Sequence, residues 1–208
     1  MKAISVIFIV ARYPTTYGHT SVINNLCHGL NELGHKTAIG AFSFDNDPPK
    51  GVEKVMLKKN ELLRSGVASL KYDIIHPHQA QVLYYLLFKK PEKPIVFHYH
   101  AASNIIQELN LKLSMKLFKK RISKFISVSE KASHHLEEWA GKCDDVVIYN
   151  GVDTKFFHPD LDQPYRKGTP QLLFVSVLRR YKKTVDLIRV MPELLKTYPK
   201  AHLQIVGN

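Results

Sequence analysis

The sequence predicts an α/β protein built on a doubly wound parallel sheet, followed by a partial second βαβ unit. Short apolar runs rich in Val, Ile and Phe alternate with segments of helical period, and polar loops separate them. Strands that are buried on both faces have continuous apolar runs of this kind, and crossover helices connect them in parallel. A chain of 208 residues with 45% hydrophobic residues is large enough to bury such a core.

The predicted elements follow the order that this fold requires. Residues 4–11 form the first strand, and an apolar stripe over residues 22–33 predicts a helix that ends at Gly34. The longest helix is expected over about residues 104–124. Further strands are expected at residues 37–42, 73–76, 94–99, 125–128 and 146–149.

A stretch without periodicity follows residue 153 and contains three prolines and a glycine, which is typical of a linker. We therefore assign residues 1–168 to a complete domain with its linker and residues 169–208 to the beginning of a second domain. The second part has the pattern of a strand, a helix interrupted by Pro192 and another strand, at residues 172–178, 182–198 and 202–206. Such a βαβ piece needs a partner surface to cover its sheet.

Composition narrows the classes of partner. The net charge of +12 favours anionic partners such as phosphates, nucleotides, nucleic acid or an acidic membrane surface. No nucleic-acid recognition motif is present, so nucleic acid is not the expected partner. Cys27 and Cys143 are too few for a disulfide framework, which favours a reducing, cytoplasmic location. No apolar run reaches the roughly 18 residues of a membrane-spanning helix.

Ligands of a doubly wound sheet bind at the carboxyl ends of its strands. The first such loop, residues 12–19, precedes a helix whose N-terminus suits a phosphate, although Gly18 is equally explained as a simple turn. Neither G-x-G-x-x-G nor G-x-x-x-x-G-K-[ST] occurs there, which disfavours a dinucleotide enzyme and a P-loop NTPase. The candidate cleft residues at the strand ends are Tyr17, His19, His78, His98, Ser129 and Asn150.

Histidines are concentrated at two of these strand ends. His98 and His100 are alternate residues and project together toward a ligand near His76 and His78. A zinc site is disfavoured, because Pro77 is expected to break the strand and no carboxylate or cysteine supplies a further ligand. One cleft histidine acting as acid, base or hydrogen-bond donor is the favoured interpretation. His134 and His135 are expected at the surface.

Two basic segments have two interpretations each. Arg179, Arg180, Lys182 and Lys183 follow a predicted strand and open a helix, so they form either an anion site or a solvated basic turn. The helix over residues 106–125 is basic and amphipathic. Docking of its apolar face on the sheet is favoured over membrane insertion, and its lysines remain able to contact anionic lipid.

Asp45-x-Asp47 precedes two prolines and is assigned to a solvated turn.

Several segments together resemble the retaining GT-B glycosyltransferases of family 4, which have two Rossmann-like domains. The resemblance covers essentially the whole chain, and its most specific parts are Val-Ser-Glu at 128–130 and the I-x-N-G-V-D segment at 148–153. The other matching segments are Tyr17-Gly18, Leu33-Gly34-His35, the D-I-I-H-P-H segment at 73–78, the P-I-V-F-H-Y-H-A segment at 94–101 and the start of the second domain from Leu172 to Asn208.

The resemblance implies that the first domain contacts the acceptor and the second holds a nucleotide-sugar. It places Gly18 at the donor phosphate, His100 as the catalytic histidine near the reacting sugar, and Lys182 at the diphosphate leaving group. Arg179 or Arg180 is expected to reach the same phosphates, because Ser176-Val177 replaces the Gly-Arg pair of the family. Tyr17 and Lys183 stand where the family has glycine. No metal or other cofactor is implied.

Two functions follow as hypotheses. The first is a glycosyltransferase that moves a sugar from a nucleotide diphosphate to a lipid-linked or polysaccharide acceptor. The chain ends before the E-x7-E donor motif of the family, so we expect a truncated enzyme or one part of a split enzyme, incompetent alone, with a C-terminal domain supplied in trans. The second hypothesis is a non-catalytic module that binds a glycan or lipid headgroup. In both, the cytoplasmic face of a membrane is a candidate surface.

Overall fold

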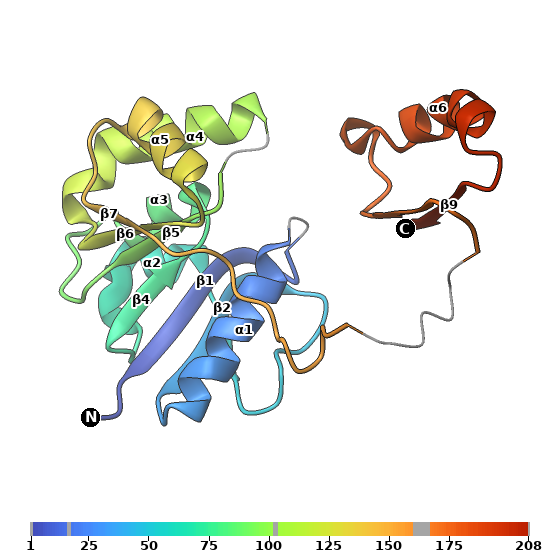
Figure 1. Ribbon diagram of the computed structural model, residues 1–208. Coiled ribbons are helices and arrows are strands. Elements are labelled where there is room, and N and C mark those ends of the chain that lie inside the picture. Colours follow the sequence, from blue (N-terminus) through green and yellow to red (C-terminus); the bar gives the residue numbers. More distant parts are fainter. Residues whose placement is uncertain (1, 16–17, 102–103, 160–166, 208) are drawn as a thin grey trace. The chain divides into compact units, whose positions relative to one another are not determined.

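The computed structural model in Figure 1 describes residues 2–15, 18–101, 104–159 and 167–207. The chain divides into two compact units, Met1–Asp153 and Thr154–Asn208. The expected assignment of residues 1–168 and 169–208 to an acceptor-side and a donor-side domain stays a prediction. None of the helices in the described residues has the length and apolarity needed to cross a membrane.

Parallel strands form the sheet of the first unit. β1 (Ser5–Tyr13) lies between β2 (Lys36–Phe44) and β4 (Ile74–Pro77), and β3 (Glu53–Met56) pairs with β2. A second parallel set has the order β5 (Val96–Tyr99), β6 (Lys124–Ser127) and β7 (Asp145–Val147).

A bridge between Ile75 and Ile95 joins the edge strand β4 to β5. The chain therefore proceeds from β1 to β3 in one direction across the sheet and from β4 to β7 in the other. This reversal beside β1 is the topological switch point of a doubly wound sheet, where ligands bind. The predicted α/β fold class is confirmed.

The two faces of β1 are buried in separate clusters. Val6, Phe8 and Val10 pack against Ile23 and Cys27 of α1 (His19–Glu32). Ile7 and Ile9 belong to the cluster on the opposite face. That cluster contains side chains of α2 (Lys59–Ser65), α3 (Leu83–Leu86), α4 (Ile105–Phe118) and α5 (Glu130–Ala140). Figure 1 shows α4 and α5 lying side by side, away from α1. Short 3-10 turns occur at Gly66–Ser69, Ala80–Val82 and Lys119–Arg121.

The second unit is a small βαβ piece. β8 (Gln171–Val175) pairs in parallel with β9 (His202–Val206), and α6 (Thr184–Thr197), which contains Pro192, connects them after a 3-10 turn at Arg180–Lys182. None of the described residues of this unit is buried.

The strands expected from the sequence are present with shifted boundaries, and one further strand was not predicted. β3 has the polar sequence EKVM, which carries no apolar run, and the sequence did not predict it. The helix expected to reach residue 124 ends at Phe118, because a 3-10 turn redirects the chain into β6. The strand expected over residues 172–178 ends at Val175, because its partner β9 ends at Val206.

Candidate functional site

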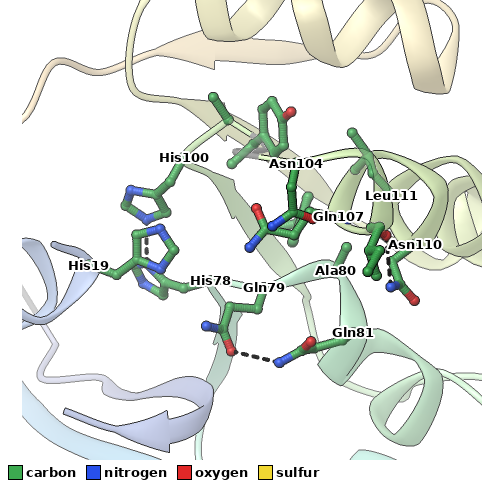
Figure 2. Close-up of a pocket in the computed structure, with 14 residues that line it drawn as sticks. His19, His78, Gln79, Ala80, Gln81, His100, Asn104, Gln107, Asn110 and Leu111 are labelled. Atoms are coloured by element: carbon green, nitrogen blue, oxygen red, sulfur yellow. Dashed lines mark hydrogen bonds between the residues drawn. The ribbon is translucent and has the colours of Figure 1, made fainter. Parts of the chain in front are cut away.

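A cavity of about 300 Å³ lies at the carboxyl ends of β4 and β5, beside the switch point (Figure 2). His19 of α1, Gln79 after β4, His100 after β5 and Asn104 before α4 contribute to its walls. All of these residues belong to the first unit. The cavity therefore occupies the position at which open α/β sheets bind their ligands.

Local interactions of the chain fix each wall. Gly18 is the N-cap residue of α1 with φ of 54°, a left-handed conformation that glycine adopts without steric cost, and it has no side chain with which to cap the helix. The first-turn N–H groups of α1 are therefore a potential anion site. The Gln79 side chain accepts a hydrogen bond from the Ala11 N–H at 2.8 Å, which attaches the loop after β4 to β1. Asn104 caps α4 by accepting from the Gln107 N–H at 3.0 Å.

Five histidine rings gather between α1, β4 and β5. The rings of His98 and His100 have centroids 4.5 Å apart, and those of His78 and His98 are 4.8 Å apart. His76 stacks on His78 at 4.8 Å, and His19 lies 4.3 Å from His100. His78, His100 and His19 line the cavity, as Figure 2 shows, whereas His76 and His98 are not among its lining residues.

One hydrogen bond connects the cavity wall to the residues behind it. The Nδ1 of His78 lies 2.7 Å from the Nε2 of His100, so one ring donates to the other. The Nε2 atoms of His76 and His78 and both ring nitrogens of His98 are buried without a hydrogen-bond partner among the described residues. A buried polar group without a partner costs about 1–3 kcal/mol. The cluster is therefore expensive to maintain unless a ligand satisfies it.

Burial keeps this cluster uncharged at neutral pH. It lowers the pKa of His76 to about 3, and the neighbouring His98 adds to the effect. It lowers the pKa of His98 to about 4 and, together with the adjacent histidines, that of His100 to about 2. The pKa of His78 lies well below its usual range for the same reasons. Neutral imidazoles act as hydrogen-bond donors, acceptors or metal ligands rather than as cations.

Side-chain amides form the rest of the polar lining, and the sequence analysis did not single them out. They are Gln79, Gln81, Asn104, Gln107 and Asn110. Each amide offers both a donor and an acceptor, which matches the hydroxyl groups of a sugar. Their spacing is the signal that could have found them. Gln79 and Gln81 are alternate residues after β4, and Asn104, Gln107 and Asn110 follow one another at intervals of three from the cap of α4 onward.

The other predicted cleft residues lie elsewhere. The Ser129 hydroxyl accepts from the Ala132 N–H at 3.2 Å and caps α5, and it does not line the cavity. Asn150 is exposed on the segment after β7 and does not line it either. Tyr17 falls outside the described residues. Their predicted roles stay predictions.

The basic residues predicted at the donor phosphates belong to the second unit, whereas Gly18 belongs to the first. Arg179, Arg180 and Lys182 follow β8 and precede α6, so they occupy a strand-end loop of the smaller sheet. Arg180 and Lys182 are exposed. Lys183, where the family pattern has glycine, has φ of 55°, which is the left-handed conformation that glycine favours.

One expectation about the histidine segments is wrong, and another holds only in part. Pro77 does not break the strand, because it pairs with Ile9 inside the β4 register and the His78 N–H donates to the Ile9 carbonyl at 3.0 Å. His135 is partly buried: its Nδ1 lies 2.6 Å from the Tyr99 hydroxyl, and its side chain is 25% exposed. His134 is exposed, as expected.

The parallel sheet with its switch-point cavity, followed by a second βαβ unit, has the Rossmann-like architecture found in GT-B glycosyltransferases. A sequence profile described as Glycosyltransferase Family 4 matches residues 17–156. The chain belongs to this family. A comparison with curated protein sequences found no match.

Solved structures agree on the fold. Sucrose-phosphate synthase from Thermosynechococcus elongatus aligns with a TM-score of 0.74 at 15% identity, over 98% of this chain and 62% of the synthase. HepE from Anabaena, solved with UDP and glucose, aligns with a TM-score of 0.72 at 15% identity, over 97% of this chain and 60% of HepE. WaaG, a glycosyltransferase involved in lipopolysaccharide biosynthesis, aligns at 0.54 with 13% identity, over 98% of this chain and 70% of WaaG.

Proposed function

We propose that this chain is the acceptor-side part and the beginning of the donor-side part of a retaining glycosyltransferase. The enzyme transfers a sugar from a nucleotide-diphosphate sugar to a lipid-linked or polysaccharide acceptor, without a metal in the transfer step. The observation that carries the proposal is the histidine- and amide-lined cavity at the switch point of a chain that belongs to Glycosyltransferase Family 4. HepE, solved with UDP and glucose, and WaaG, involved in lipopolysaccharide biosynthesis, support the donor and acceptor classes.

Basic residues that match the charge developed in the reaction support this proposal. Transfer from a nucleotide-sugar builds positive charge on the sugar and negative charge on the departing diphosphate. Fixed cations stabilise the diphosphate in the transition state. Arg179, Arg180 and Lys182 supply such cations at the end of β8, next to the N-terminus of α6. The first turn of α1 after Gly18 offers N–H groups to a phosphate.

The acceptor is proposed to bind in the cavity of the first unit. Its amide side chains hydrogen-bond sugar hydroxyls, and Tyr99 and Leu111 add apolar surface for the sugar ring. His100 lies at the mouth of the histidine cluster and is proposed to contact the reacting sugar. Because burial keeps its ring neutral, His100 acts through hydrogen bonding and its bond to His78 orients it.

Activity of the whole gene product with a panel of nucleotide-sugars tests the proposal. We expect transfer or slow donor hydrolysis with one of them, also after treatment with EDTA. His100→Ala is expected to reduce turnover about 10²- to 10⁴-fold. His134→Ala, which removes an exposed histidine of α5, is the matched control and should retain full activity.

Three results would contradict this assignment. Absence of both transfer and hydrolysis with every donor opposes an enzyme, and acceptor binding without transfer favours a non-catalytic module. An unimpaired His100→Ala enzyme removes the proposed role of His100.

The exposed face of α4 supports a location at the cytoplasmic face of a membrane. Its buried side carries Leu111, Met115 and Phe118, which dock on the sheet as the sequence predicted. A second apolar row lies on the opposite side and is more than half exposed. This row consists of Ile105, Ile106, Leu109, Leu113 and Leu117.

Lysines accompany this exposed row. Lys112, Lys116 and Lys120 are exposed next to it, and the chain carries a net charge of +12. Apolar side chains that enter the headgroup region and flanking lysines that pair with anionic lipid are the pattern of an interfacial helix. An anionic lipid surface is therefore the proposed occupant of this face.

Vesicle flotation tests the membrane surface. Leu113→Gln/Leu117→Gln is expected to reduce binding to vesicles that contain anionic lipid at least about 10-fold, because it removes two insertion points. Leu33→Gln, at a still more exposed leucine after α1, is the control and should bind normally. Equal binding to purely zwitterionic vesicles, or unchanged binding of the double variant, would contradict the assignment.

A further inference from the structure

The histidine cluster behind the cavity contains more nitrogen ligands than a sugar transfer uses. His76, His78 and His98 each offer a ring nitrogen, and these three atoms lie within 4.8 Å of one another. Among the described residues, this is the one group of three or more His, Cys, Asp or Glu side chains placed in this way. His76 is 8% exposed, His78 is 2% exposed and His98 is 3% exposed, so bulk water does not reach them freely.

Four buried ring nitrogens of this group have no hydrogen-bond partner among the described residues. They are the Nε2 atoms of His76 and His78 and both nitrogens of His98. Buried polar atoms in proteins are nearly always satisfied by protein, water or an ion. Three unsatisfied imidazoles in one place therefore indicate a ligand that accepts several nitrogen lone pairs at once.

The hydrogen bond of His78 has the form found at metal centres. A metal-bound histidine usually donates its second ring N–H to a fixed acceptor, which orients the ring and sets its tautomer. The Nε2 of His78 is buried without a hydrogen-bond partner among the described residues, and its Nδ1 lies 2.7 Å from the Nε2 of His100. When the Nε2 of His78 binds the ion, its Nδ1–H donates to His100. His100 then orients the ring of His78.

We propose that His76, His78 and His98 form a binding site for one divalent transition-metal ion of the zinc type. Imidazole is a preferred ligand of such ions, and a set of three histidines is an established zinc-binding arrangement in proteins. The two strands prepare this set, because His76 and His78 are alternate residues at the end of β4 and His98 lies on the adjacent β5.

Ion binding requires a small rearrangement of the rings. Zinc lies about 2.0–2.1 Å from histidine nitrogens, so the three nitrogens must converge from their present separations. The rings of His76 and His78 are stacked with an interplanar angle of 25°, and those of His78 and His98 are tilted by 34°. Rotation about the Cβ–Cγ bonds brings the nitrogens together, because such terminal torsions are broad. The ion takes no part in the transfer step proposed above.

Cobalt binding to the untagged, chelator-stripped protein tests the site directly. Co²⁺ bound by nitrogen ligands in a four-coordinate site gives strong visible absorption, which hydrated Co²⁺ lacks. We expect one ion per chain and displacement of Co²⁺ by Zn²⁺. His98→Gln and His76→Asn should each weaken Co²⁺ binding at least about 100-fold, and His100→Ala, which removes the ring that orients His78, about 10-fold.

Two exposed histidines provide matched controls. His28→Ala and His134→Ala remove imidazoles at exposed positions of α1 and α5 and should leave binding unchanged. Zn²⁺ should raise the unfolding temperature of the wild type and of these controls, but not that of His98→Gln. Circular dichroism without metal establishes that each variant folds. Absence of the visible bands, or wild-type binding by folded His98→Gln and His76→Asn, would overturn the site. Neither result depends on transferase activity.

Discussion

Cys27 lies on α1 with none of its surface exposed, between the helix and the first two strands. Burial raises the pKa of its thiol to about 12, although a hydrogen bond with Thr37 acts in the opposite direction. The neutral thiol is therefore strongly favoured in the folded chain. In the unfolded chain the same thiol ionises near its ordinary value of 9.0.

This difference in the pKa of the thiol makes the free energy of unfolding depend on pH in the alkaline range. Between about pH 9 and 12 the folded chain holds a proton that the unfolded chain has lost, so the free energy of unfolding decreases as pH rises. One group contributes up to about 1.4 kcal/mol per pH unit to this decrease. Denaturant unfolding of the wild type and of Cys27→Ala at pH 8 and 10 measures it. The wild type should lose more stability than the variant, and equal losses would show that the thiol ionises normally in the fold.

Single residues also show where sequence reasoning was limited. The clustering of His76, His78, His98 and His100 followed from strand alternation alone, because alternate residues share a face. The continuity of β4 up to Pro77 did not follow from the sequence pattern, since it depends on the hydrogen bond from the His78 N–H to the Ile9 carbonyl. The partial burial of His135 depends on Tyr99, which lies 36 positions away in the sequence.

At the scale of elements, α5 depends on a residue that the sequence assigned to the cleft. The Ser129 side chain accepts from the Ala132 N–H, and Glu130 adds a negative charge in the first turn, where the helix dipole favours it. The buried residues Ala132 and Leu136 attach α5 to the core. Ser129 therefore has a structural role as the cap of α5, and this role is separate from any contact with a ligand.

Two substitutions separate these roles. Ser129→Ala should lower the free energy of unfolding by about 1 kcal/mol, because it leaves an N–H of the first turn unsatisfied. Ser129→Asp retains a capping oxygen and should restore stability. Urea denaturation measures both. If Ser129→Asp is stable but impairs the complete enzyme, the residue also contacts a ligand, whereas an unchanged stability of Ser129→Ala would contradict the cap.

Elements differ in how clearly the sequence encodes them. The apolar runs that became β1 and the centre of β2 were visible because burial on both faces leaves no polar positions there. β3 was not, because an edge strand with the sequence EKVM is held by pairing with β2 rather than by its own hydrophobicity. On α4 the inner apolar side was predicted, but the exposed leucines could not be recognised until the sheet defined which side faces inward.

At the scale of the whole molecule, the order of strands explains why the cavity could be placed before its lining was known. In an alternating α/β pattern with right-handed crossovers, the carboxyl ends of all strands lie at one edge, and the ligand site lies where the order reverses. Which side chains fill that edge depends on loop conformations. The amides of Gln81, Gln107 and Asn110 reach the cavity through a 3-10 turn and a helix start that periodicity does not specify.

The two units are expected to differ sharply in local stability. Two helices of equal length make the comparison direct, because α1 and α6 have 14 residues each. Ile23 and Cys27 bury α1 in the core, whereas α6 has no buried residue and leaves Val185, Ile188 and Val190 more than half exposed. Amide protection follows burial, since exposed helices open at little cost. In hydrogen exchange of this chain, the amides of α6 should therefore exchange at least about 100-fold faster than those of α1.

Addition of a domain that covers the apolar side of α6 should slow its exchange without affecting α1. Equal protection of the two helices in the chain alone would show that α6 already buries its apolar side, and would contradict the description of this unit as an uncovered βαβ piece.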